Sequence, residues 1–277
     1  MVSPPSGAVD PRTALEAAGL LPDTEIDLAA VAVQLARIDA PGADWQAALD
    51  TLSAIARDAA ALAGATGPEC AGALEALLGG RWGFRGDRER YDDPDNANLI
   101  RVLERKRGLP VALGIVWLHA AAAAGWSAHG IDFPSHFLVG IAATPPVVVD
   151  VFDGGTPLAA PALRALLKRI EGPLAELRPG LLRPMGNRAV LLRLANNLKL
   201  RRLAAGDMDG ALACAKDMLR IAPDHAALWR EAGLMHQHLD QVAAALRCFE
   251  RFLALVPQGE PAEGVRAAMQ ALRARLN

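Results

Sequence analysis

Apolar residues recur at helical spacing through the first part of the chain. A Pro-Gly pair and a Gly-Gly pair interrupt this spacing, as expected where helices end. Three helices are therefore predicted, over Glu25–Ile38, Asp44–Leu62 and Cys70–Leu78. Residues 1–24 precede this pattern and are expected to form a flexible tail.

A polar, turn-rich stretch from Arg81 to Asn98 is followed by a return of helical spacing. One helix is predicted from about Leu99 to Gly108, and a second begins at Pro110 within the almost wholly apolar run Leu109–Trp126. A membrane-spanning helix needs about 20 apolar residues. This run is shorter, contains a histidine and owes much of its apolar character to alanine. We therefore expect a buried helix of a globular core, and no membrane as a partner.

The pattern then changes to short runs of β-branched and aromatic residues at His136–Ile141 and Val147–Phe152. About five residues separate the two runs, which predicts an antiparallel hairpin. A further helix is predicted near Ala160–Ile170. The Pro- and Gly-containing stretch Glu171–Gly186 predicts a domain boundary.

The last part of the chain repeats with a period of 34, which is the period of the tetratricopeptide repeat, a helix–turn–helix unit. Identical residues lie 34 positions apart at Ala211 and Ala245, Leu212 and Leu246, Cys214 and Cys248, Leu219 and Leu253, and Pro223 and Pro257. We expect two repeats and a capping helix over Glu260–Leu276 within a domain of residues 187–277. The domain before it is expected to span residues 25–186.

Composition narrows the classes of protein to which the chain can belong. Among 277 residues, 52% are hydrophobic and 22% are charged, which is enough to bury a sizeable core. The net charge of −2 argues against a nucleic-acid partner, because phosphate contacts need clustered Lys and Arg. Three cysteines exclude a disulfide scaffold and favour a reducing cytoplasm, and the start MVSPPSGAVDPR lacks the features of an export signal.

The strongest candidate chemistry lies on the predicted hairpin, where His136 and Asp150 are brought together. If Ile141 pairs with Val147, the two residues are diagonal neighbours on one face, and a register shifted by two places them directly opposite. A carboxylate that holds one imidazole nitrogen fixes the tautomer and leaves the other nitrogen free to act as a base. The pair is also explained if it only stabilises the hairpin.

A nucleophile to complete this pair is missing from the expected place. A sharp turn into a helix N-terminus activates a thiol, and Gly108 to Pro110 has the sequence of such a turn. No Cys, Ser or Thr lies between Gly108 and Gly125. The remaining candidates for a nucleophile are water and Cys70, which is more readily explained as a buried helix residue. No metal-ligand cluster or cofactor-binding motif is found, so neither a metal nor a cofactor is expected.

Three runs of the sequence carry a family resemblance: Arg107–Gly114 (RGLPVALG), Asp132–Val139 (DFPSHFLV) and Val149–Gly155 (VDVFDGG). They resemble the bacterial SirB-type proteins, which join a transglutaminase-like domain to tetratricopeptide repeats. The resemblance covers most of the chain and is weakest over the first sixty or so residues. It implies an α+β fold: a papain/transglutaminase-like core with a short antiparallel sheet and an N-terminal helical region, followed by an all-α tetratricopeptide-repeat segment.

The same resemblance assigns roles to three positions. In active transglutaminase-like relatives, a cysteine at a helix N-terminus works with a strand histidine and a strand aspartate, to which His136 and Asp150 correspond. The cysteine position falls at or near Pro110, and Ala112 stands where many SirB-type proteins have Ser or Thr. Pro110 is thus identified as a degenerate nucleophile position.

Two functions are compatible with these features. The first is a pseudoenzyme scaffold whose repeats bind a protein or peptide partner. The second is a hydrolase or acyl transferase that acts on an amide or peptide, with His136 as general base and Asp150 as the residue that orients it. The oligomeric state cannot be read from the sequence.

Overall fold

A computed structural model describes residues 9–62, 67–178 and 180–275, and these divide into two compact units. Unit 1 contains Leu21–Leu194 and the few residues before Arg12, and unit 2 contains Arg12–Leu20 and the chain from Ala195 onward. The division falls inside a helix, whereas the expected boundary between residues 186 and 187 falls at the start of that helix.

The flexible tail expected over residues 1–24 is not what the structure shows from residue 11 onward. Helix α1 (Pro11–Leu20) buries Leu15 and Ala18, and a 3-10 turn follows at Asp23–Glu25. The sequence signal was weak because only two positions of this ten-residue helix, Leu15 and Ala18, are buried. Residues 1–8 lie outside the described residues.

The predicted helices of unit 1 are present, with local signals that explain their ends. Asp27, Asp44 and Asn98 each accept backbone N–H bonds as N-caps of α2, α3 and α5. The third predicted helix is α4, continued by a π-helical turn that runs through Gly79 and Gly80 to Arg81. The helices before the sheet are α2 (Leu28–Asp39), α3 (Trp45–Ala60), α4 (Glu69–Leu74), the π turn (Glu75–Arg81), a 3-10 turn (Pro94–Ala97), α5 (Leu99–Arg105) and α6 (Pro110–Ala123).

Helix α6 forms the centre of unit 1. Its residues are buried almost all round, including Trp117, and the proline at its first position costs no hydrogen bond. Close packing against α6 also requires a glycine at position 155, which has a φ of +100°. Gly155 lies directly against the Trp117 ring, which leaves no room for a side chain at this position. Within the described residues, no helix is long and apolar enough to cross a membrane.

A five-stranded antiparallel sheet in the order β6-β5-β4-β3-β7 carries the predicted hairpin. Strand β4 has the predicted bounds, and Ile141 pairs with Val147, which is the first of the two predicted registers. Strand β3 was not predicted; it contains His129, which pairs with Gly140 of β4. The strands are β3 (Ala128–Phe133), β4 (His136–Ile141), β5 (Val147–Asp150), β6 (Thr156–Pro157) and β7 (Pro184–Met185), and the separate parallel pair is β1 (Arg85–Gly86) and β2 (Arg107–Gly108).

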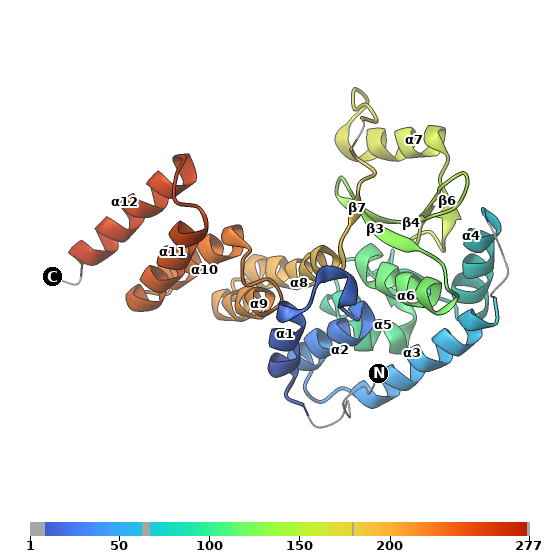
Figure 1. Cartoon of the computed structure of the whole chain (residues 1–277), viewed down its shortest axis with the longest axis horizontal. Helices are drawn as coiled ribbons and strands as arrows, with labels where there is room; N and C mark the ends of the chain where they lie inside the picture. The colour runs from blue at the N-terminus through green and yellow to red at the C-terminus, as the bar shows by residue number, and fades with distance from the viewer. Residues whose placement is uncertain (1–8, 63–66, 179, 276–277) are drawn as a thin grey trace. The chain divides into compact units, whose positions relative to one another are not determined.

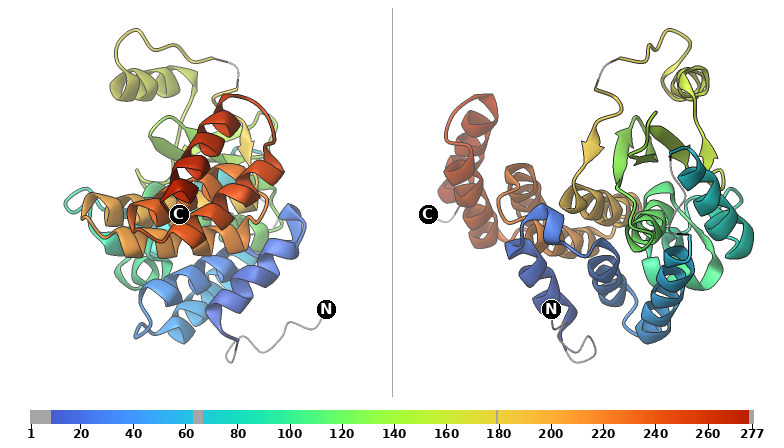
Figure 2. Two further views of the ribbon diagram at one scale, coloured as in Figure 1. Left: turned by 90° about the vertical axis from the view of Figure 1, so that its left-hand side faces the viewer. Right: turned by 45° about the vertical axis from the view of Figure 1, so that its right-hand side comes forward.

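Helices cover both faces of this sheet. Helix α6 lies on one face (Figure 1). On that face Gly114 contacts the Phe137 ring. Helix α7 (Ala160–Glu171) lies on the other face, as the right-hand view of Figure 2 shows, and its buried leucines pack against Leu138. Alternate residues of β4 therefore face different helices, which is the pattern of a fully buried strand.

Unit 2 contains the predicted repeats. Helix α8 (Asn187–Ala204) and α9 (Met208–Ile221) form the first helix pair, α10 (Ala226–His238) and α11 (Val242–Leu255) form the second, and α12 (Glu260–Ala274) follows as the predicted last helix. Phe249 of α11 is fully buried against Gly233 of α10. In the first repeat Lys199 replaces that glycine, and its buried amine pairs with Glu231.

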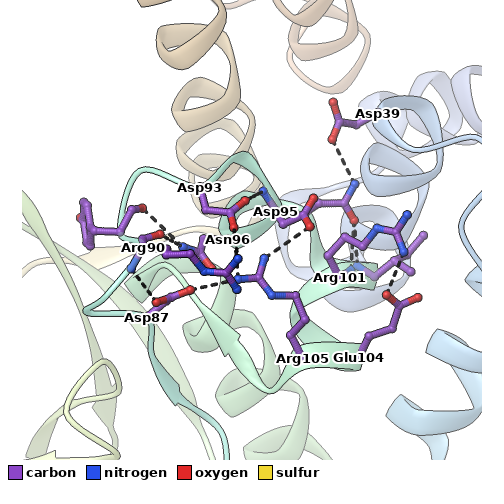
Figure 3. A network of polar contacts seen from close by, with 12 residues as sticks. Asp39, Asp87, Arg90, Asp93, Asp95, Asn96, Arg101, Glu104 and Arg105 are labelled. Carbon is purple, nitrogen blue, oxygen red and sulfur yellow. Dashed lines mark hydrogen bonds and ion pairs between the residues drawn. The ribbon is translucent and has the colours of Figure 1, made fainter.

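The polar loop after β1 is tied to α5 by a network of ion pairs, shown in Figure 3. Arg105 lies 3.0 Å from Asp87, 3.3 Å from Asp93 and 3.4 Å from Asp95. Burial by itself raises the pKa of Asp87, but hydrogen bonds from Arg90 and Asn96 and the charge of Arg105 outweigh it, so this pKa is lowered. Arg105 therefore anchors this loop to α5.

Replacing Arg105 by methionine should remove the charge that compensates buried Asp87 while keeping most of the side-chain volume. We expect the free energy of unfolding in urea to fall on the order of 3 kcal/mol, because the buried carboxylate of Asp87 loses its ion pair with Arg105. Arg101→Met is the matched control on the same helix, since Arg101 pairs with exposed Glu104 and should change stability little. Equal effects of the two variants would contradict this role of Arg105.

Candidate functional site

His136 and Asp150 are hydrogen-bonded, as the first predicted register requires. His136 is the first residue of β4 and Asp150 the last of β5, so they are diagonal neighbours across the pair. The distance from His136 Nε2 to Asp150 Oδ1 is 3.0 Å. The side chains are only 13% and 10% exposed, so water screens this bond little.

The environment of Asp150 determines which nitrogen of His136 is free. A carboxylate can only accept, so Nε2 carries the proton and, in the neutral imidazole, Nδ1 carries the lone pair. The backbone N–H of Phe152 also donates to Asp150 Oδ1, at 3.0 Å, and fixes the carboxylate. Within the described part of the chain, no hydrogen-bond partner is found for His136 Nδ1. The ring is thus arranged as an oriented base.

Aromatic side chains enclose this pair. The Phe152 ring meets the His136 ring edge to face at 6.3 Å and the Tyr91 ring at 5.8 Å. Phe152 rests on Gly86, where a side chain would collide with the ring, and the guanidinium of Arg88 lies 5.9 Å over its face. Sequence reasoning missed Phe152 and Tyr91. Phe152 directly follows the strand that ends at Asp150, and this proximity was the available signal.

Arg193 on α8 supports the start of β4 from another direction. Its Nη2 donates to the carbonyl oxygen of His136 at 2.7 Å, and its Nη1 pairs with Asp132 on the adjacent strand. The guanidinium also lies 6.0 Å over the Phe137 ring. Arg193 therefore holds the backbone that presents His136. It was not predicted, because a separation of 57 residues gives no local signal.

The turn that leads into α6 brings no nucleophile. Pro110 is buried at the first helical position, after Leu109, whose N–H donates to the carbonyl of Asn96 at 2.9 Å. Proline has neither an N–H nor a reactive side-chain atom. The next residues, Val111 and Ala112, are equally unreactive and buried.

The three cysteines are free thiols in buried positions. Burial raises the pKa of the Cys70 thiol, which works against formation of the thiolate that nucleophilic attack requires. No hydrogen bond joins Cys70 to His136 in the described residues. Cys214 and Cys248 lie in unit 2, where they occupy the same position in successive repeats and are buried.

A large polar cavity lies on the other side of Phe152. Its volume is about 1060 Å³, and Phe152 and Gly86 form part of its wall. Arg88, Arg107 and Glu75 also line it, so the cavity presents charges of both signs. Phe152 thus contacts the His136 ring and also forms part of the cavity wall.

The other histidines do not extend this site. His119 bonds the carbonyl of Leu52 at 3.0 Å, and His236 bonds Gln241 at 2.6 Å. Burial lowers the pKa of His129 on β3. Over the residues described, no three His, Cys, Asp or Glu side chains are grouped so that they could hold a metal ion.

Comparison with protein families identifies both parts of the chain. Residues 43–196 match the model of the transglutaminase-like superfamily, and residues 198–270 match a tetratricopeptide-repeat model. These matches confirm the transglutaminase-like fold class and the repeats expected from the period of 34.

Two relatives place the chain more closely. A UPF0162 protein of Xylella fastidiosa is 31% identical over 198 residues, which cover 70% of each chain. Protein SirB1 of Salmonella typhimurium is 27% identical over 201 residues, which cover 72% of this chain and 74% of the relative. The resemblance to SirB-type proteins is therefore confirmed.

A solved structure, that of menin, covers 88% of this chain and 70% of its own at 12% identity, with a TM-score of 0.42. A similarity of this size supports no inference about the present chain. The match to the family model, in contrast, spans more than half of the sequence. The chain belongs to the transglutaminase-like superfamily, with bacterial relatives that include SirB1 and the UPF0162 proteins.

Proposed function

We propose that this chain is a non-catalytic interaction protein, in which the transglutaminase-like domain serves as a scaffold and the tetratricopeptide repeats bind a protein partner. Tetratricopeptide repeats generally mediate protein–protein interactions. The domain boundaries expected from the sequence, residues 25–186 and 187–277, are kept in this proposal. Its place is the cytoplasm, where three free thiols stay reduced.

The observation that carries the proposal is a pair of exposed leucines on the first helices of the two repeats. Leu200 of α8 is 53% exposed and Leu234 of α10 is 45% exposed, and they lie 34 residues apart, at the same repeat position. Each has a polar residue four positions before it, Asn196 and Arg230, on the same helical face. A repeated display of apolar and polar side chains suits recognition of an extended partner.

The unreactive turn into α6 supports the non-catalytic part of the proposal. The family resemblance assigns the nucleophile position at or near Pro110, and the Cys70 thiol, whose pKa burial raises, is poorly suited to replace it. In this interpretation the bond between His136 and Asp150 joins the ends of two strands. A hydrogen bond to a carboxylate contributes about 1.5–3 kcal/mol to stability.

A second candidate function is favoured by one observation, the hydrogen bond from His136 Nε2 to Asp150. That bond leaves Nδ1 as an oriented base, which suits a hydrolase or acyl transferase acting on an amide or peptide with water as the nucleophile.

Substituting both Leu200 and Leu234 by glutamate should strongly reduce the amount of partner that the full-length chain captures. Charged side chains at both positions oppose burial of the repeat face, so we expect at least about tenfold less co-purified partner from a bacterial lysate. Quantitative mass spectrometry of the captured proteins measures the change.

Leu174→Glu provides the matched control, because Leu174 is an exposed leucine of unit 1 that lies outside the repeats. It should leave capture unchanged. If the double variant captured the same partners in the same amounts as the control, binding through the repeats would be refuted.

Peptide hydrolysis assays separate the second candidate from the first. The non-catalytic proposal expects no turnover above that of an inactive control. If turnover is found, the alternative expects His136→Gln to reduce it by about a hundredfold or more, since the general base is lost. Cys70→Ala should then retain full activity, and loss of activity in that variant would instead identify a thiol nucleophile.

A further inference from the structure

Unit 2 contains an apolar cavity that the repeat motif does not predict. Its volume is about 400 Å³, and we call it the Cys248 pocket. It lies among α1, α9, α10 and α11, away from Leu200 and Leu234, which do not line it. Its floor and walls are formed by Leu219, Pro223, Trp229, Ala232 and Cys248. The Trp229 indole is held in place by its N–H bond to the carbonyl of Pro223, at 2.7 Å.

Helix α1 forms the remaining wall and is fixed there by specific contacts. Arg12 binds the buried carboxylate of Asp217 through Nε at 3.0 Å and Nη2 at 3.4 Å. Glu16 lies 3.1 Å from Arg220 Nε. Gly19 contacts the backbone carbonyl of Arg220 so closely that a side chain would not fit. The pocket is therefore preformed, which lowers the conformational cost of binding.

The rim of the Cys248 pocket combines an exposed apolar residue with a free positive charge. Leu20, at the end of α1, is 86% exposed. Glu16 and Asp217 already neutralise Arg12 and Arg220. Exposed Lys216 also lines the pocket, and no ion-pair partner for its amine exists among the residues the structure describes. An occupant that presents a carboxylate beside an apolar group would complement this rim.

We propose that the Cys248 pocket binds an acidic peptide segment of a partner protein, which inserts one leucine-sized side chain between Leu219 and Trp229 and places a carboxylate at Lys216. The proposal rests on the proposed interaction function and adds a second contact surface to it. Apolar anchors that enter a pocket inside a polar rim are the usual centres of such interfaces.

The probe is a capped synthetic peptide with one central leucine flanked by glutamates, added to the full-length chain. Alkylation of Cys248 by iodoacetamide reports occupancy, because the thiol lies in the pocket wall. Burial raises the pKa of Cys248, so labelling is carried out near pH 9 and followed by peptide mass mapping. Cys214, buried in the same unit but outside the pocket, is the internal control.

At about 90% occupancy, the peptide should slow alkylation of Cys248 about tenfold and leave Cys214 unchanged. A peptide with serine in place of leucine, and one with lysines in place of the glutamates, should protect much less. Equal protection by the serine peptide, or no protection by the leucine peptide at any soluble concentration, would overturn the proposal.

Lys216→Glu tests the charge at the rim without disturbing the core, because this residue is exposed. It should weaken binding of the acidic peptide about fivefold or more, while Lys168→Glu on α7 should have no effect. Unchanged affinity in Lys216→Glu would overturn the proposal. If affinity for the acidic peptide is unchanged but partner capture still depends on Leu200 and Leu234, the proposed binding role of the Cys248 pocket is refuted. The proposed interaction function of the repeats is then retained.

Discussion

The hydrogen bond between His136 and Asp150 is the interaction on which the geometry of the candidate site depends. It joins the start of β4 to the end of β5, and Phe152 reinforces it from both sides: its N–H holds the carboxylate and its ring covers the imidazole. Arg193 fixes the backbone of His136 from α8. The same contacts that stabilise the hairpin also orient a base, so geometry at these residues alone does not distinguish a structural pair from a working one.

The residue at position 110 supports the non-catalytic proposal. The positive end of the helix dipole at a helix N-terminus stabilises an anionic nucleophile. In this fold, α6 begins at Pro110, directly after the turn that follows β2. Proline supplies the helix with a favourable first residue and supplies no nucleophilic atom. In the non-catalytic proposal the chain keeps the pair of His136 and Asp150, which is also useful for stability, and has proline at or near the position that the family resemblance assigns to the cysteine.

The sequence predicted the parts of the structure that have local signals. Strand β4, helix α6 and the repeat period follow from spacing within a few residues or from exact recurrence. Strand β3 was not predicted because Gly130 and the charged Asp132 interrupt its apolar run. Helix α1 was not predicted because its burial depends on contacts with α9, which is more than 190 residues away in the sequence. At the site, His136 and Asp150 were predictable from their register. Tyr91 and Arg193 were not, since only the folded chain brings them there.

In the non-catalytic proposal, no side chain of this protein forms a covalent intermediate with the help of His136. Intact mass spectrometry of the full-length chain, after incubation with an activated acyl ester and with a vinyl sulfone, tests it directly by comparing the natural sequence with His136→Ala. If the proposal is correct, the same adducts form in both proteins. All of them then come from reaction of exposed amines or from slow labelling of thiols. An adduct on one residue of unit 1 that forms rapidly and disappears with His136 would contradict it.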